Sequence, residues 1–182
     1  MSEEYSKEYY QAINQEENAQ AKVVADYLTQ AYKPLSVIDL GCGTGLYLDK
    51  FNVPKKLGID ISDAAFTFGY GNLKKADLSK PIDLGRWDLG ICFEVLEHID
   101  AEFADVAVDN LARSSDKLVI TAAMPNQPGL NHVNCQPQQY WEEKFRARGY
   151  TRDYFNEYWL AQKVSEVQHT AWLIKNLMVY TK

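Results

Sequence analysis

The sequence predicts an α/β fold in which a mostly parallel sheet of seven strands carries helices on both faces. Two observations predict it. Short apolar runs of strand length alternate with longer stretches whose apolar residues recur every three or four positions. In addition, an apolar run over 35–40 leads directly into the glycine-rich segment 41–45 and then into a helical pattern. Strands that alternate with helices favour parallel pairing, because each helix returns the chain to the same edge of the sheet.

The first half of the chain begins with a segment, 1–14, that contains Tyr5, Tyr9 and Tyr10. We expect it to be irregular or weakly helical and to fold over a bound ligand as a flexible lid. Asn14 and Glu17 form a capping box for a helix over 15–32, which Pro34 ends. The further elements expected in this half are a strand over 35–40, a short helix over 46–51, a strand over 56–60, a brief helix over 63–68 ended by Gly69 and Gly71, and an edge strand over 72–76.

The second half continues the alternation. The elements expected are a buried strand over 88–93, a helix over 100–113, a strand over 117–122, a helix from Pro137 to about Arg148, a strand near 150–155, a helix near 157–172 and a last strand over 176–180. We expect the last strand to be antiparallel. Tyr140, Trp141 and Phe145 have helical packing spacing and are interpreted as core. The predicted architecture is a Rossmann-like, doubly wound sheet.

Length and composition limit the function classes. The chain has 182 residues, which suits one domain over 1–182 with a full core. A net charge of −6 is a poor footprint for nucleic-acid binding, which needs a basic face. There is no apolar run long enough for a membrane span and no signal-peptide pattern, so we expect a cytoplasmic protein. Cys42, Cys92 and Cys135 lie far apart, which argues against a disulfide framework, and we expect no metal site.

The glycine-rich segment indicates a nucleotide-binding turn between a strand and a helix. Its pattern is Asp39-x-Gly41-x-Gly43-x-Gly45, whereas a dinucleotide-binding turn has the spacing G-x-G-x-x-G. An acid ahead of the glycines suits a ligand with a positive amine better than one with a pyrophosphate. Asp60 lies 19 residues after Gly41 at the end of a predicted strand, where acids accept hydrogen bonds from ribose hydroxyls. The alternative is an ordinary tight turn with a turn acid.

These residues, with the run E-V-L-E-H-I from Glu94 to Ile99, resemble the motifs of class I S-adenosylmethionine-dependent methyltransferases. The stretch N-H-V-N-C-Q-P-x-x-Y-W from Asn131 is similar to a narrower group of small bacterial and phage members. The resemblance implies a cofactor site made of Asp39, Gly41, Cys42, Gly43, Gly45, Asp60, Ile61, Asp77, Leu78, Phe93 and Glu94. One departure is the short segment 62–72, where such proteins have a fuller helix.

The same resemblance implies transfer of a methyl group from S-adenosylmethionine to an oxygen or nitrogen of a small acceptor, a saccharide among the candidates, with S-adenosylhomocysteine as product. The connection after the fifth strand, 122–134, is long for its type, and such loops usually carry function. It supplies His132 as the first candidate for a general base, ahead of His98. The candidate acceptor contacts are Asn126, Asn131, Asn134 and Tyr9.

Two other function classes stay open. A nicotinamide-dependent oxidoreductase needs the dinucleotide glycine spacing, which the chain lacks. A protein that binds S-adenosylmethionine without catalysis, as a regulatory or partner protein, fits the same motifs. Detection of a methylated product separates this second class from an enzyme. The sequence predicts neither the acceptor nor the oligomeric state.

Overall fold

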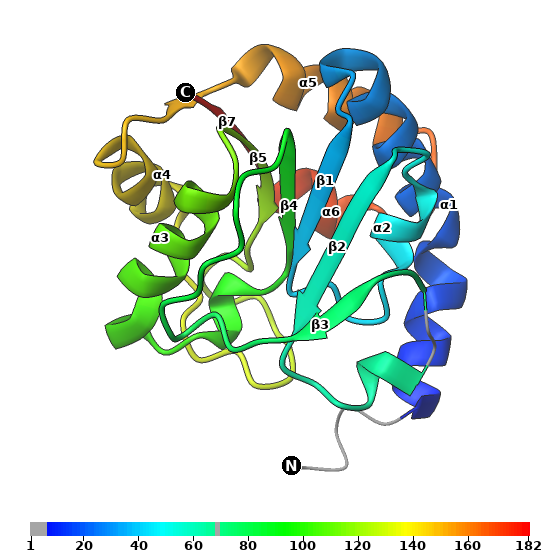
Figure 1. Cartoon of the computed structure of the whole chain (residues 1–182), viewed down its shortest axis with the longest axis horizontal. Coiled ribbons are helices and arrows are strands. Elements are labelled where there is room, and N and C mark those ends of the chain that lie inside the picture. Colours follow the sequence, from blue (N-terminus) through cyan, green and yellow to red (C-terminus); the bar gives the residue numbers. More distant parts are fainter. Residues whose placement is uncertain (1–6, 68–69) are drawn as a thin grey trace.

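The computed structural model describes residues 7–67 and 70–182. Two parts of the predicted elements lie outside these ranges. They are the first six residues of the predicted lid, which include Tyr5, and positions 68 and 69 at the end of the predicted brief helix. The described chain forms a single seven-stranded sheet covered by helices (Figure 1). No helix in these ranges is both long enough and apolar enough to cross a membrane.

The strand order is β3-β2-β1-β4-β5-β7-β6. The strands are β1 (Ser36–Leu40), β2 (Lys55–Asp60), β3 (Leu73–Lys75), β4 (Leu89–Phe93), β5 (Lys117–Thr121), β6 (Thr151–Arg152) and β7 (Leu177–Thr181). The pairs among β1 to β5 are parallel, and β7 is antiparallel to both of its neighbours. The prediction of a mostly parallel sheet with an antiparallel last strand is confirmed. The order also reverses between β1 and β4, which places a ligand crevice at their carboxyl ends.

Helices cover both faces, as predicted (Figure 1). They are α1 (Lys7–Tyr32), α2 (Leu46–Lys50), α3 (Ala104–Ser114), α4 (Gln138–Arg146), α5 (Tyr154–Val164) and α6 (Ala171–Asn176). One core lies between the sheet and α3 with α4, and it contains the buried Trp141 and Phe145. A second core lies between the other face and α1, α2, α5 and α6. The apolar stripes of the helices thus account for the two layers.

The first helix is longer than predicted. It begins at Lys7, so the expected irregular segment is helical from that residue on, and Asn14 is inside the helix instead of at its start. The reason is packing: Tyr10 is buried and Ile13 is half-buried, and they extend the helical spacing of Ala21, Val24 and Leu28 toward the N-terminus.

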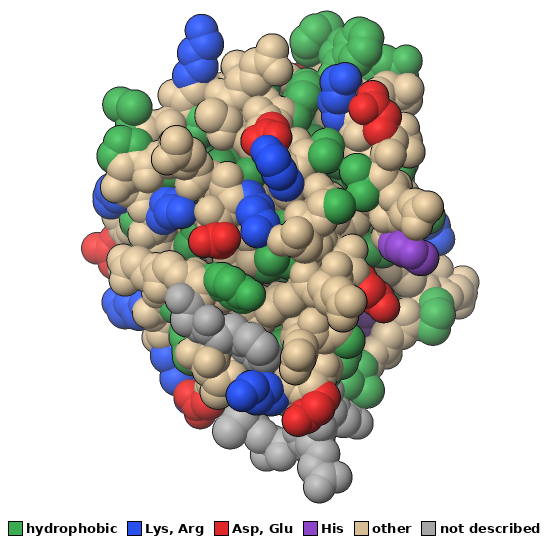
Figure 2. All heavy atoms as spheres, turned by 90° about the vertical axis from the view of Figure 1, so that its right-hand side faces the viewer, with side chains coloured by type: hydrophobic (Ala, Val, Ile, Leu, Met, Phe, Trp, Pro, Cys, Tyr) green, Lys and Arg blue, Asp and Glu red, His purple; other side chains and the backbone are tan. Residues whose placement is uncertain are grey.

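Figure 2 shows the surface on the side of the molecule where α1 lies. Positive and negative side chains are interspersed on it.

Two other elements differ from prediction. The tail helix expected over 157–172 is split into α5 and α6. The hydroxyl of Thr170, the residue before α6, shares its proton between the carbonyl groups of Val164 and Val167, which helps to satisfy the end of α5. The brief helix expected over 63–68 is a single 3₁₀ turn, Ala65–Thr67, in the part of this segment that the structure describes.

Candidate functional site

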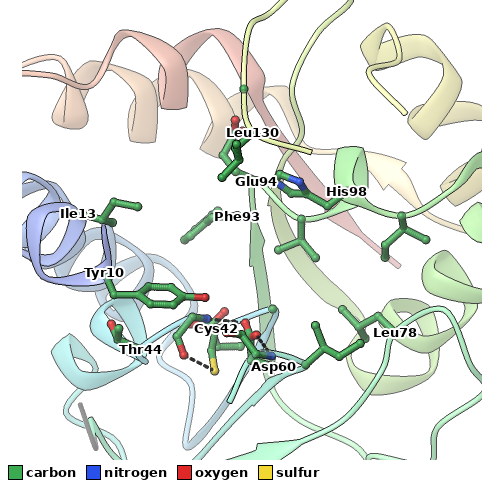
Figure 3. A pocket seen from close by; sticks show the side chains of 18 of the residues that line it. Tyr10, Ile13, Cys42, Thr44, Asp60, Leu78, Phe93, Glu94, His98 and Leu130 are labelled. Atoms are coloured by element: carbon green, nitrogen blue, oxygen red, sulfur yellow. Dashed lines mark hydrogen bonds between the residues drawn. The ribbon is translucent and has the colours of Figure 1, made fainter. Parts of the chain in front are cut away.

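A cavity of about 670 Å³ opens at the carboxyl ends of β1, β2 and β4. Its walls come from the first turns of α1, the glycine-rich turn, the segments after β2, β3 and β4, and the loop 127–132 (Figure 3). Pockets that enclose a cofactor-sized molecule typically measure about 300–1,000 Å³. The cavity therefore has room for one such ligand.

The glycine-rich turn forms the floor under this cavity. The backbone N–H groups of Gly41 and Cys42 both donate to the carbonyl of Ile59, at 2.8 and 2.9 Å, which holds the start of the turn to the end of β2. Gly41 has φ +83°, and a Cβ there would overlap the side chain of Val95. Only glycine meets both requirements, so this turn can pass close under a ligand. Gly45, with φ +84°, caps α2 and lies behind the turn, outside the residues that line the cavity.

Asp60 fixes the turn from the end of β2. Its carboxylate accepts a hydrogen bond from Gly43 N at 2.7 Å and another from Ser62 N at 2.8 Å. Burial raises the pKa of Asp60 above its usual value in spite of these bonds. Asp39 is 3% exposed, and its pKa is raised well above the usual value by burial and then by the charge of Asp60. The two acids make this end of the cavity strongly negative whenever both are ionised.

The segments after β2 and β3 form the next wall, with Ile61, Asp77 and Leu78. Ile61 is 58% exposed at the cavity, so an apolar ring placed over it would be shielded from water. The Asp77 carboxylate accepts hydrogen bonds from Ser79 N at 3.0 Å and Ser79 Oγ at 2.6 Å, and it pairs with the Lys80 ammonium at 3.0 Å, which leaves acceptor capacity on the carboxylate. The bond from the Ser79 hydroxyl makes the largest contribution to lowering the pKa of Asp77, and Lys80 lowers it further.

Helix α1 contributes a wall that the sequence predicted only as a lid over 1–14, with Tyr9 and Tyr10. Its Tyr10, Ile13, Asn14 and Glu17 side chains line the cavity. Asn14 Oδ1 accepts a hydrogen bond from the Thr44 hydroxyl at 2.7 Å, while its buried Nδ2 has no partner among the described residues. Burial raises the pKa of Glu17 to about 7, and the charge of Glu94 adds to this. An amide and a carboxyl group one helical turn apart therefore line the cavity, with the amide donor buried behind the surface.

Glu94 lies at the end of β4 in a left-handed backbone conformation, with φ +50°. Its carboxylate oxygens accept from Asn176 Nδ2 at 2.9 Å and from Gln127 Nε2 at 3.1 Å. The antiparallel insertion of β7 explains the first contact, since α6 delivers Asn176 beside β5 and β4. Strain held by such contacts is typical of functional sites. Phe93 lines the cavity beside Glu94 and packs edge-on against Tyr47 at 4.8 Å between ring centroids.

The two candidate histidines lie together at the other end of the cavity from Asp60 and Cys42 (Figure 3 labels His98, Cys42 and Asp60). The rings of His98 and His132 are 5.0 Å apart, with 71° between their planes. His98 Nδ1 is 3.1 Å from the carbonyl oxygen of Asn131, and His132 Nδ1 is 3.2 Å from that of Gln127. Burial lowers the pKa of His98. The sequence predicted each histidine separately, and the fold brings them into contact.

Beneath the histidines lies Glu97, which the sequence analysis did not select. It is fully buried, and burial followed by the charge of Glu94 raises its pKa to about 8. The three candidate asparagines lie outside the residues that line the cavity. Asn126 and Asn131 are exposed and have φ of +66° and +55°, so they shape the loop, and Asn134 is buried with its Oδ1 accepting from Gln136. These three asparagines would therefore influence an acceptor by shaping the loop and not by direct contact.

The charge of the cavity is one-sided. The described residues that line it include six carboxylic acids and no lysine or arginine; the acids are Glu17, Asp39, Asp60, Asp77, Glu94 and Asp100. A pyrophosphate group is bound by positive side chains, backbone N–H groups or a helix N-terminus. Such a wall repels a polyanion and attracts a cation through those of its acids that are ionised, and a bound cation in turn favours the ionised form of the acids beside it.

No protein-family model and no curated protein matches this sequence. Solved structures do match it. An amino pentose methyltransferase from Micromonospora echinaspora, solved with S-adenosylmethionine, has a TM-score of 0.71 at 15% identity and covers 95% of this chain and 96% of its own. The sugar N-methyltransferase of a Streptoalloteichus species has a TM-score of 0.70 at 16% identity and covers 96% of this chain and 91% of its own.

A third structure in the comparison is a [4+2]-cyclase, with a TM-score of 0.59, 16% identity, and coverage of 88% of this chain and 81% of its own. Since a cyclase and methyltransferases share the fold, the likeness at these identities establishes architecture and leaves the reaction to be argued from the site. The sheet order, the antiparallel β7 and the two sugar methyltransferase structures agree on that architecture. The chain has the Rossmann-like fold of the class I S-adenosylmethionine-dependent methyltransferases.

Proposed function

We propose that this protein binds S-adenosylmethionine in the cavity and transfers its methyl group to an oxygen or nitrogen of a small molecule, with an amino sugar or other saccharide as the first class to test. The observation that carries the proposal is the charge of the cavity, with six acids and no lysine or arginine among its described lining residues. S-adenosylmethionine carries a sulfonium and an ammonium group and no phosphate. Its charge suits the cavity, whereas that of a dinucleotide does not.

The proposed cofactor pose follows the chemistry of the walls. The ribose hydroxyls would donate to Asp60, and the adenine ring would cover Ile61 and Leu78, with its amine directed to Asp77. The methionine end would lie over Gly41, Cys42 and Gly43, near Phe93 and Glu94. There Glu17 would accept from the ammonium and Asn14 Nδ2 would donate to the carboxylate, which would satisfy a buried donor. Gly45 would act indirectly, by shaping the turn.

The acceptor would occupy the end of the cavity bounded by Tyr9, Leu130, His98 and His132. A lone pair on its oxygen or nitrogen forms the new bond to the methyl carbon while the carbon–sulfur bond breaks. The bonding electrons stay on sulfur, which yields neutral S-adenosylhomocysteine, and the acceptor loses a proton. Holding donor and acceptor in line supplies much of the rate, and a group that takes up the proton adds to it. We assign the acceptor end to the two histidines.

Calorimetry tests the cofactor. S-adenosylmethionine or S-adenosylhomocysteine should bind with a dissociation constant near micromolar, about −8 kcal/mol. NAD serves as the control and should not bind. Binding of NAD without binding of either sulfur compound would overturn the proposal.

Mass spectrometry tests the reaction. The full chain is incubated with labelled S-adenosylmethionine and a panel of amino sugars, neutral sugars, nucleotides and phenols. Incorporation of the label into a panel member identifies the acceptor class. On that acceptor His132→Ala should keep its affinity for S-adenosylhomocysteine and lose turnover. Tight cofactor binding with no product from any class would favour a regulatory protein that binds the cofactor without catalysis.

A further inference from the structure

We propose that Glu97, His98 and His132 form a binding site for one divalent transition-metal ion at the acceptor end of the cavity. One nitrogen or oxygen atom from each of these side chains lies within 4.8 Å of the other two. The site joins the 3₁₀ turn after β4, Leu96–His98, to the loop after β5. The sequence predicted no metal site because no spacing along the chain suggested one, whereas the fold places these residues side by side. The proposed use of the ion in catalysis rests on the methyltransferase function, but its binding does not.

Glu97 supplies the first argument. Its side chain is fully buried, and Oε1 accepts from the backbone N–H of Ala123 at 3.2 Å. The other oxygen, Oε2, is buried and has no hydrogen-bond partner among the described residues. A buried polar atom without a partner costs about 1–3 kcal/mol. A carboxyl group buried in this way is stable when it keeps a proton or lies next to a metal ion or a cationic group, and no lysine or arginine lines this cavity in the ranges that the structure describes.

The histidines supply the second argument. In each ring Nδ1 faces a backbone carbonyl, Asn131 O for His98 and Gln127 O for His132. A carbonyl only accepts hydrogen bonds, so these contacts favour the tautomer with the proton on Nδ1 and the lone pair on Nε2; in His132 the Cys135 thiol, 3.5 Å from Nδ1, favours the opposite tautomer when it donates. Metal-binding histidines show this arrangement, in which an outer carbonyl holds the Nδ1–H and fixes the ring orientation.

Backbone hydrogen bonds hold His132, the ligand from the loop after β5, beside the other two. The backbone carbonyl of Glu97 accepts from the N–H groups of both Val133 and Asn134, each at 2.9 Å. These bonds fasten the residue after His132 to the turn that carries Glu97 and His98. Gly129 lies against the His132 ring, where a Cβ would overlap it. The two chain segments that supply the ligands are therefore joined independently of any ion.

The donor set selects the ion. Two imidazole nitrogens and one carboxylate oxygen suit Zn²⁺, Mn²⁺ or Fe²⁺ better than Mg²⁺ or Ca²⁺. Bonds of about 2.0–2.2 Å bring donor atoms to about 3–4 Å from one another, which small rotations of the side chains provide. His98 and His132 also line the cavity, so the open coordination position faces the acceptor. An acceptor oxygen bound there would become more acidic. His132 would then act through the ion and not as the base that the sequence predicted.

Titration calorimetry with ZnCl₂ tests the site in the full chain after treatment with a chelator, and the visible spectrum of added Co²⁺ reports the ligands. We expect one ion per chain. His132→Ala and Glu97→Gln should each lower zinc affinity by about 100-fold or more, beyond the usual effect of losing an outer partner. His169→Asn, at an exposed histidine elsewhere, is the matched control and should bind zinc as the parent does. Cys135→Ser should also do so, although Cys135 Sγ lies 3.5 Å from His132 Nδ1.

Retained affinity for S-adenosylhomocysteine shows that each variant is folded. No zinc or cobalt binding by the parent protein would overturn the metal site. Loss of binding in Cys135→Ser with normal binding in Glu97→Gln would also overturn it, in favour of a cysteine site. Zinc binding without any binding of the cofactor would leave the metal site standing and refute the methyltransferase proposal. Cofactor binding and turnover by a protein that binds neither zinc nor cobalt would refute the metal site and leave the methyltransferase proposal standing.

Discussion

Glu17 offers a quantitative test of how the cavity treats charge. In the folded protein burial raises the pKa of Glu17 to about 7 from an ordinary value of 4.5. Between these two values the unfolded chain releases the proton while the folded chain keeps it. The free energy of unfolding therefore falls as pH rises through this window, by about 1.4 kcal/mol per pH unit at most. The full difference corresponds to roughly 3 kcal/mol, present below pH 4.5 and lost above pH 7.

The perturbation is Glu17→Gln, which keeps the shape and removes the titration. Urea unfolding of the parent and the variant is measured from pH 4.5 to pH 8 without ligand. We expect the variant to gain stability relative to the parent as pH rises, by up to roughly 3 kcal/mol between the ends of the range. Glu16→Gln, at the exposed neighbouring position, is the matched control and should follow the parent. Parallel profiles for the parent and Glu17→Gln would refute the burial argument.

Three further outcomes are expected. Asp60→Asn should weaken S-adenosylhomocysteine binding by about 10- to 100-fold in calorimetry, because it removes a charge-assisted acceptor, and binding equal to that of the parent would contradict the pose. Gly41→Ala should lower the free energy of unfolding more than Gly85→Ala, because both glycines have positive φ but only Gly41 faces a side chain, Val95, and equal losses would show that the contact is unimportant. Deletion of residues 1–12 should leave cooperative unfolding intact but reduce turnover, since Tyr9 and Tyr10 line the cavity, and unchanged kinetics would exclude a role for this segment.

The parts of the site that the sequence predicted are those with local signals. Gly41 and Gly43 lie just after β1 and Asp60 ends β2, and strand ends meet at one edge of a parallel sheet whatever the details of packing. Their positions at the cavity needed only the order of the elements. Leu78 and Phe93 line the cavity for the same reason, although their contacts with a cofactor stay predictions.

The parts that the sequence missed depend on packing between distant segments. Asn14 and Glu17 have the spacing of a helix cap, but the helix begins at Lys7 and passes through them, with Tyr10 buried in its first turn. The division between α5 and α6 has no glycine or proline to mark it. The approach of Glu97 to His132 is set by the backbone bonds that fasten the loop after β5 to the turn after β4. Spacing along the chain carries no information about such a contact.

The length of α1 has a consequence for how ligands leave. Its 26 residues form a continuous rod of about 39 Å. At the far end Tyr27 and Tyr32 donate to Asn156 and Asp153, at 2.9 and 3.2 Å, which anchors the rod to the start of α5. A rod without a break cannot swing its first turns about a hinge, so we expect the way past Tyr10 to open by unwinding of those turns. Helix ends wind and unwind within about a microsecond, far faster than typical turnover. The amide hydrogens of residues 8–14 should therefore exchange with solvent when the cavity is empty and become protected as it fills.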